Sequence, residues 1–151
     1  LLKNCIYELS YLAKSRKIIL KSNIPEKIYV EIDNSRFSQV IFNIITNAIK
    51  NTPPKGLVFI RLTEYQNHVD IIVKDTGIGI TKEEKERLFQ KFGKIERYGK
   101  GYNLDIEGVG LGLFISKGIL DLHGGEILVE SEGRNRGSTF IIRLFKKNIT
   151  R

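Results

Sequence analysis

One segment constrains the fold more than any other: a long apolar stretch with the period of a helix. Its apolar residues run from Phe37 to Ile49. Pro53 and Pro54 end it, because proline lacks the N–H that a continuing helix needs. Either Asp33 or Asn34 supplies the N-terminal cap. This is the strongest helix prediction in the chain.

A narrow polar stripe runs along this otherwise apolar helix. On a wheel of about 100° per residue its members fall within roughly 40° on either side of Asn43. They are Arg36, Gln39, Asn43, Asn47 and Lys50. A solvated surface explains such a stripe, but asparagine has no advantage over lysine or glutamate on an exposed helix. Two asparagines at i and i+4 can instead offer amide oxygens to one hard cation, and Lys50 can meet a phosphate.

The other periodicities predict further elements in chain order. We expect a helix over 1–14, a hairpin over 17–22 and 27–32, strands over 57–63 and 68–74, a helix over 81–89 with a Thr81–Glu84 capping box, a long loop over 93–107, a helix over 111–122, and strands over 126–131 and 138–145. A loop this long inside a compact domain is usually functional or disordered.

Glycines gather in one part of the chain: thirteen of the 14 lie between Gly77 and Gly137. The first group is Asp75-Thr76-Gly77-Ile78-Gly79, directly after a predicted strand. A carboxylate there can accept hydrogen bonds from an exocyclic amine while the bare backbone lets a flat ring approach. An ordinary Asp-Gly turn into the next helix explains the same residues, so this motif alone does not decide.

A second glycine group, Gly108-Val109-Gly110-Leu111-Gly112, opens the predicted helix over 111–122. Free N–H groups at a helix start bind phosphate, and glycine gives access to them. The spacing is neither the dinucleotide fingerprint nor a Walker A motif. Close packing at a glycine-rich helix start is the alternative explanation.

Composition narrows the class of protein but names no partner. The 151 residues fit one domain, with 41% hydrophobic and 28% charged residues, which excludes collagen-like, disulfide-scaffold and disordered chains. One cysteine, Cys5, forms no internal disulfide, and we expect it to be buried. No apolar run is long enough for a membrane span. The net charge of +8 favours a nucleotide, a nucleic acid or an acidic protein face as partner. Because the chain lacks Met and opens Leu1-Leu2, we expect a fragment of a longer protein.

Taken together, the motifs closely resemble the ATP-binding domain of sensor histidine kinases, within the superfamily that includes DNA gyrase, heat-shock chaperone ATPases and MutL proteins. The resemblance runs from about Leu1 to Phe145. Its motifs are Asn-x-x-x-Asn-Ala-x-Lys, Asp-x-Gly-x-Gly, Gly-x-Gly-x-Gly-Leu, Gly-Ser-Thr-Phe over 137–140, Leu-Phe-x-Lys-Phe over 88–92 and Leu-His-Gly-Gly over 122–125. It implies an α+β fold: a two-layer α/β sandwich whose mixed, mostly antiparallel sheet is covered on one face by helices, the Bergerat ATP-binding fold. We expect this domain over 1–146 and a frayed basic tail over 147–151.

The resemblance also implies roles for individual residues. It makes Asn47 a magnesium ligand with Asn43 as its companion, and Lys50 a neighbour of the phosphates. Asp75 would bind the adenine amine beside Gly77 and Gly79, supported by Thr139 through water. The phosphates would meet Gly108, Gly110, Leu111 and Gly112, with 93–107 as a lid from which Arg97 or Lys100 reaches the γ-phosphate. Two residues depart from the family pattern: Val109 replaces the common Ser or Thr, and Asn51 a frequent aromatic residue.

The function implied is that of a kinase module that binds Mg-ATP and transfers the γ-phosphoryl to a histidine on a separate helical dimerisation domain upstream. A response-regulator receiver domain would then take the phosphoryl group, and we expect the domain in the cytoplasm. The alternative is an ATP-operated clamp or chaperone ATPase, but those relatives carry a water-activating glutamate where this chain has Asn43. We expect no nucleic-acid partner, because the basic residues are dispersed and no base-stacking aromatic motif is present. We expect both histidines, His68 and His123, to be structural.

Overall fold

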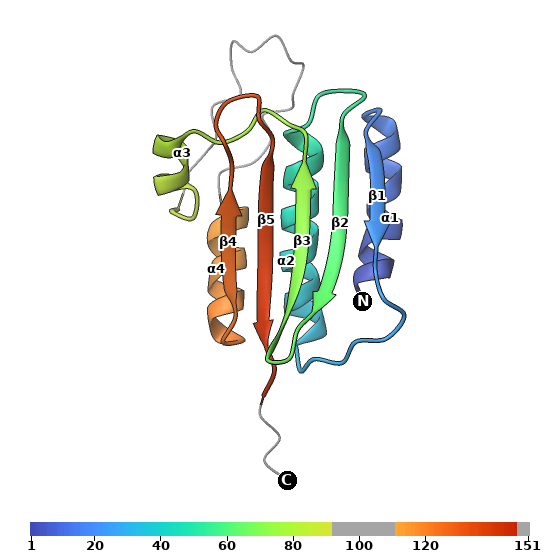
Figure 1. The fold of residues 1–151 in the computed structure, drawn as a ribbon, viewed down its shortest axis with the longest axis vertical. Helices are drawn as coiled ribbons and strands as arrows, with labels where there is room; N and C mark the ends of the chain where they lie inside the picture. Colours follow the sequence, from blue (N-terminus) through green and yellow to red (C-terminus); the bar gives the residue numbers. More distant parts are fainter. Residues whose placement is uncertain (92–110, 148–151) are drawn as a thin grey trace.

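Five strands form one sheet, and three of the four helices cover one of its faces (Figure 1). The computed structural model describes residues 1–91 and 111–147. Its elements are α1 (Leu2–Ser15), β1 (Ile19–Asn23), α2 (Asn34–Lys50), β2 (Leu57–Glu64), β3 (His68–Asp75), α3 (Lys82–Arg87), α4 (Gly112–Leu122), β4 (Glu126–Glu130) and β5 (Ser138–Phe145). Apart from the predicted hairpin, each helix and strand expected from the sequence is confirmed within a few residues at its ends.

The sheet has the strand order β1-β2-β3-β5-β4. The β1–β2 pair is parallel, and the other three pairs are antiparallel. Helices α1, α2 and α4 lie behind this sheet in Figure 1, and its other face points toward the viewer. The predicted class, a two-layer sandwich with a mixed, mostly antiparallel sheet covered on one face, is therefore confirmed.

The predicted hairpin over 17–22 and 27–32 is wrong. Strand β1 pairs instead with β2, in a register that runs from Ile19 opposite Leu57 to Asn23 opposite Arg61. Residues 24–32 contain no strand, and Ile24, Val30 and Ile32 pack against the core. Alternating apolar residues on this segment thus reflect one-sided packing, which gives the same period as a strand. The parallel partner of β1 is β2, which follows α2 in the chain, and no pattern near β1 in the sequence indicates a pairing over that distance.

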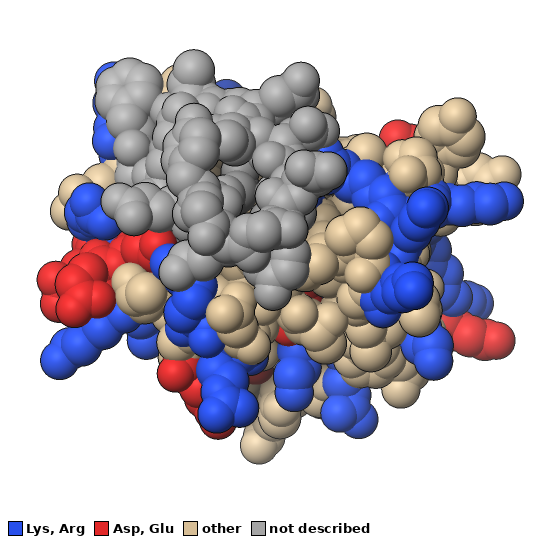
Figure 2. Space-filling view, turned by 90° about the horizontal axis from the view of Figure 1, so that it is seen from above, with Lys and Arg blue, Asp and Glu red and all other residues tan. Residues whose placement is uncertain are grey.

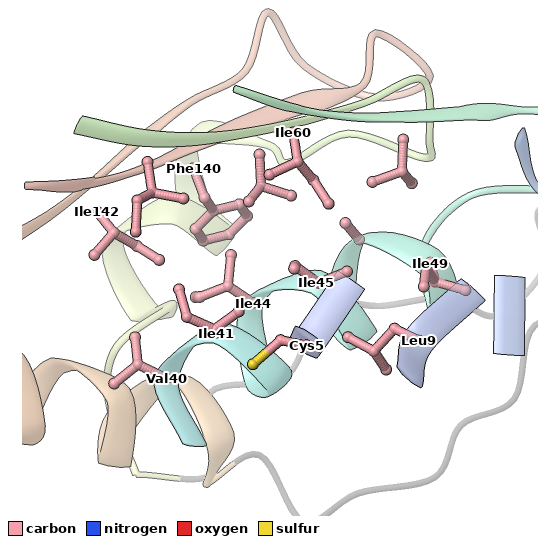
Figure 3. Close-up of a cluster of buried hydrophobic side chains, with 14 of the residues drawn as sticks. Cys5, Leu9, Val40, Ile41, Ile44, Ile45, Ile49, Ile60, Phe140 and Ile142 are labelled. Atoms are coloured by element: carbon pink, nitrogen blue, oxygen red, sulfur yellow. The ribbon is translucent and has the colours of Figure 1, made fainter. Parts of the chain in front are cut away.

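Helix α2 occupies the centre of the core (Figure 3). Val40, Ile41, Ile44 and Ile45 are completely buried, between α1 on one side and sheet residues such as Phe140 on the other. Of the two candidate caps, Asp33 is the one used: its Oδ1 accepts a hydrogen bond from the Arg36 N–H at 3.0 Å. The apolar period read from the sequence and the buried face of the helix therefore agree.

His123 joins the end of α4 to the start of α2. Its Nδ1 lies 2.8 Å from the Ile119 carbonyl oxygen, and its Nε2 accepts the Asp33 N–H at 3.0 Å. Donation from one ring nitrogen and acceptance at the other require a neutral ring. The structural role expected for this histidine is thus supported: one hydrogen bond holds its ring at the end of α4, and the other reaches the N-cap residue of α2.

The remaining expectations fall partly inside the described residues. The capping box is present: Glu84 N–H donates to Thr81 Oγ1 at 3.2 Å, and the Thr81 N–H donates to Glu84. Cys5 is buried, as expected. None of the helices in the described parts is long and apolar enough to cross a membrane. The predicted loop over 93–107 and tail residues 148–151 lie outside the described residues.

Core packing around α2 gives a first prediction. Replacement of Ile44, which is fully buried, by alanine should lower the free energy of unfolding by about 2–5 kcal/mol, because it removes buried methyl groups and leaves a cavity. The matched variant Ile19→Ala removes the same atoms from a side chain that is 50% exposed, and should cost clearly less. Urea unfolding of both variants measures the difference. Equal losses would show that Ile44 is not at the centre of the core.

Candidate nucleotide-binding site

A buried carboxylate, that of Asp75, closes strand β3 with a side chain only 3% exposed. Its Oδ1 accepts the N–H groups of Gly77 at 2.8 Å and of Ser138 at 3.3 Å, and its Oδ2 accepts the Ser138 hydroxyl at 2.7 Å. A carboxylate has about four acceptor positions, so these donors leave room for one more. The arrangement can hold a ligand N–H group at a fixed orientation.

Burial has an electrostatic consequence for Asp75. Removal of the carboxyl group from water raises its pKa, and the hydrogen bonds from Ser138 and Gly77 counteract this only in part. A carboxylate held against its solvation preference costs folding free energy, and a ligand that donates to it offsets part of that cost.

Ser138 takes the position that we expected for Thr139. Asp75 and Ser138 are direct register partners on β3 and β5, and both face the helices. Thr139 is opposite Lys74, and because side chains alternate along a strand it lies on the other face of the sheet. The sequence held a signal for this: Phe140, Ile142 and Leu144 alternate as core residues, which places Ser138 with them.

The turn between β4 and β5 holds the segment that follows Asp75. The Asn135 N–H donates to the Ile78 carbonyl at 2.7 Å, and the Gly137 N–H donates to the Gly77 carbonyl at 3.1 Å. Arg134 from the same turn forms an ion pair with Glu84 and donates to the Gly79 carbonyl at 3.3 Å. Sequence reasoning found Glu84 only as part of the capping box and missed its pairing with Arg134, because 50 residues separate the two and Arg134 belongs to no motif.

Glycine is required at some of the predicted positions by packing alone. A Cβ at Gly77 would collide with the Asn51 carbonyl oxygen, and Gly79 has φ +70 with the Gly133 carbonyl oxygen against it. The packing explanation therefore accounts for these two glycines. Gly112 differs: a Cβ there would meet no described atom closer than Asn43, at 3.7 Å, which is ordinary contact. Close packing in the described residues does not explain Gly112, whereas access of a ligand to the backbone would.

The polar stripe of α2 leads from α4 toward Asp75. Asn43 donates through Nδ2 to the Gly112 carbonyl at 3.2 Å and to the Ser116 hydroxyl at 3.2 Å. Its amide oxygen is the atom that remains to face a cation. At the other end of α2, the Asn51 carbonyl accepts the Ile78 N–H at 3.0 Å. Asn47 and Lys50, both half-buried, lie between these two contacts along the helix.

Helix α4 begins without a side-chain cap: Leu111 is its N-cap residue and makes no capping hydrogen bond. The first N–H groups of a helix lack partners within it, and such groups bind anions. This uncapped start lies beside Asn43, one of the two predicted cation ligands. Two of the predicted phosphate-binding residues, Leu111 and Gly112, are therefore next to the α2 stripe.

Four predicted residues fall outside the described part of the chain: Arg97, Lys100, Gly108 and Gly110. Within residues 1–91 and 111–147, no group of three His, Cys, Asp or Glu residues could hold a metal ion. Amide oxygens and ligand oxygens are the remaining donors for a hard cation in this part. Figure 2 views the molecule from the end at which β3 finishes. Lys and Arg side chains are spread over this end, and their positive charge favours an anionic ligand.

The fold and the comparisons with known proteins place this chain among ATPase-type domains. A protein family described as "Histidine kinase-, DNA gyrase B-, and HSP90-like ATPase" matches residues 32–148, and the chain belongs to this family. Sensor histidine kinase WalK of Bacillus subtilis is 37% identical over 135 residues, which are 87% of this chain and 22% of WalK. The chain thus spans about a fifth of that relative.

Solved structures agree with this placement. The catalytic domain of histidine kinase ThkA is similar with a TM-score of 0.79 at 28% identity, covering 96% of this chain and 91% of that chain. ThkA in complex with the response regulator protein TrrA gives a TM-score of 0.74 at 26% identity, covering 99% of this chain and 40% of that chain. The likeness covers both layers of the fold, including β3 and α2.

The raised pKa of Asp75 gives a second prediction. The folded protein holds the Asp75 proton more tightly than the unfolded chain, so this residue lowers stability as pH rises above about 4, and most at neutral pH. Asp75→Asn cannot ionise, and its amide can donate to the Ser138 hydroxyl. The variant should therefore gain stability relative to the wild type at pH 7, and the gain should shrink as pH falls toward 4.

Urea unfolding at several pH values measures this difference. The exposed Asp121→Asn variant is the control and should change stability by less than about 0.5 kcal/mol throughout. A stability difference for Asp75→Asn that does not vary with pH would contradict a raised pKa of Asp75 in the folded protein.

Proposed function

We propose that this domain binds Mg-ATP and transfers the γ-phosphoryl group to a histidine on a separate helical domain of the parent protein. The observation that carries the proposal is the buried Asp75 carboxylate, oriented by Ser138 and Gly77 on the helix side of the sheet. Its free acceptor position suits the exocyclic amine of adenine. From there α2 leads to the uncapped start of α4, which suits the phosphates.

The proposed magnesium ligands are Asn47 and Asn43, with Lys50 near the phosphates. The Asn43 amide fits this role, because its nitrogen donates to α4 and its oxygen is left for a cation. When bound, Mg²⁺ neutralises charge on the transferring phosphoryl group. The protein itself contributes position: α2 and α4, packed together, hold the two asparagines and the helix start in one arrangement.

Asn43 also favours phosphoryl transfer over hydrolysis. An amide is a poor general base, so it does not activate water as a glutamate would. Its described hydrogen-bond partners, the Gly112 carbonyl and the Ser116 hydroxyl, supply no such base either. WalK and ThkA are histidine kinases by name, which supports the kinase over the clamp-type ATPase.

The proposed partners are an upstream dimerisation and phosphoacceptor domain and a response-regulator receiver domain. ThkA was solved in complex with a response regulator protein, which supports the second of these. The roles of Gly108, Gly110, Arg97 and Lys100 around the phosphates remain part of the proposal. A cytoplasmic location is also part of the proposal, because ATP and response regulators are found there.

Nucleotide titration tests the binding site. Asp75→Asn should weaken binding of ATP by about 1–3 kcal/mol, because the acceptor for the adenine amine becomes an amide donor.

Asn47→Ala should abolish the gain in ATP affinity that Mg²⁺ gives, with the fold intact. Asn4→Ala, the same change at an exposed position of α1, is the control and should bind as the wild type does. An Asn47→Ala protein that still gains affinity with Mg²⁺ would place the ligand elsewhere.

Transfer of labelled phosphate tests the reaction. The full-length parent protein should label a histidine from ATP in a manner that needs Mg²⁺. The present 151 residues alone should bind ATP with little turnover, since they lack an acceptor in the sequence setting of a phosphoacceptor histidine. Rapid release of inorganic phosphate by the isolated domain would favour the ATPase alternative.

A further inference from the structure

The face of the sheet that carries no helix has an ordered chemical pattern. Side chains alternate between two faces along each strand, and Val58, Val73, Phe140 and Val129 point into the core. Their neighbours in sequence therefore point the other way. Figure 1 looks onto this open face, with α1, α2 and α4 behind it. The strand register gives the order of its residues in rows across the sheet.

Apolar side chains form a patch on the open face, which we call the open-face patch: Phe59, Ile72, Ile141 and Leu128. Ile72 is opposite Ile141 and Ile141 is opposite Leu128, so three of the four are direct neighbours across β3, β5 and β4. Phe59 lies on β2, one row away from Ile72. None of the four belongs to the core cluster or to its partly buried neighbours, and Leu128 is 37% exposed. Neighbouring apolar residues on the solvent side of a sheet are typical of an interaction site.

Three basic residues border this patch on one side: Lys21, Arg61 and Lys74. Phe59 is opposite Lys21 on β1 and Lys74 on β3, and Arg61 is opposite Ile72. All three are exposed, and none forms an ion pair with the described residues. On the far edge, β4 presents Glu126 and Glu130. On this face the basic residues without a described ion pair lie over β1 to β3, the apolar patch extends from β2 to β4, and Glu126 and Glu130 lie at the β4 edge. Asp70 and Arg143 on the same face neutralise one another in an ion pair.

From this pattern we propose that the open face of the sheet docks an acidic protein surface with an apolar centre. Carboxylates of the partner would lie over Lys21, Arg61 and Lys74, and its apolar residues would cover Ile72, Ile141 and Leu128. Charge complementarity of this kind sets orientation and association rate, while the apolar patch supplies burial.

Two other occupants fit less well. A second copy of the chain would bring two molecules of net charge +8 together, and their repulsion opposes association. Single-stranded nucleic acid stacks its bases on aromatic side chains, but the open-face patch holds one aromatic residue and three aliphatic ones.

This inference is independent of the proposed function. Asp75 and Ser138 lie on the helix side of the sheet, whereas the open-face patch lies on the other side. Variants of the open face should therefore keep their ATP affinity, and loss of docking is distinguishable from loss of nucleotide binding.

The test uses two synthetic helical peptides with the same leucine face, flanked by glutamates in one and by lysines in the other. Binding to the 151-residue chain is measured by fluorescence anisotropy at low salt, and amide chemical shifts locate the contact. The glutamate peptide should bind and the lysine peptide should not. Lys21→Glu/Arg61→Glu should weaken the glutamate peptide about ten-fold or more and bind the lysine peptide instead.

Three controls make the result decisive. Lys3→Glu/Lys14→Glu makes the same charge change on α1, behind the sheet, and should leave binding unchanged. Leu128→Ser changes no charge. It should weaken binding of the glutamate peptide to the wild-type chain and binding of the lysine peptide to the Lys21→Glu/Arg61→Glu chain. Equal affinity for the two peptides, or equal loss in the α1 variant, would overturn the proposal. Tighter binding of an oligothymidylate or of phosphatidylglycerol vesicles, lost in Lys21→Glu/Arg61→Glu, would also overturn it and assign the face to phosphate.

Discussion

The packing of α2 against the sheet is the constraint on which the rest of the structure depends. Val40, Ile41, Ile44 and Ile45 are completely buried, which fixes how the helix is rotated about its own axis. Once that rotation is fixed, the polar stripe has only one direction in which to point. Asn43 then meets the start of α4, and the last turn of α2 receives the segment after Asp75 through the Asn51 carbonyl. The buried apolar face of α2 thereby positions the polar side chains of its stripe.

Asp75 shows how this frame supports a group that is unfavourable by itself. Burial of a carboxylate lowers stability, and hydrogen bonds from Gly77 and Ser138 offset part of that cost. The turn from Gly133 to Gly137 in turn holds Gly77 and Ile78, and Arg134 ties that turn to Glu84 on α3. In the candidate site, one local N–H group and two groups of the sequence-distant Ser138 therefore orient the Asp75 side chain. The two faces of the sheet also differ in chemistry: Asp75 and Ser138, the proposed adenine contacts, lie on the helix side, and the basic and apolar residues of the open face lie on the other.

Much of this was predictable from local sequence. The period of 34–50, a cap at Asp33 or Asn34, the Thr81–Glu84 box and the alternation in 138–145 each depend on residues within a few positions of one another. The motif residues Asn43, Asp75 and Gly112 were found the same way, and the structure brings Asn43 and Gly112 together. Residues 24–32 show the limit, since an irregular segment packed on one side has the period of a strand. Thr139 shows a second limit. The family role was assigned one residue away from Ser138, which is the residue opposite Asp75, and a shift of one residue along a strand moves the side chain to the other face of the sheet.

Apart from 27–32, the sequence by itself determined which described segments become helices and strands and which residue types gather in motifs, because periodicity, caps and turn residues act over a few residues. Only the tertiary structure decided the partners: β1 beside β2, Ser138 beside Asp75, and Arg134 beside Glu84. It also separated the glycines that packing requires, Gly77 and Gly79, from Gly112, which packing in the described residues does not. The physical reason is that such contacts join residues far apart in the chain, and the free energy that selects them comes from burial shared by the whole core.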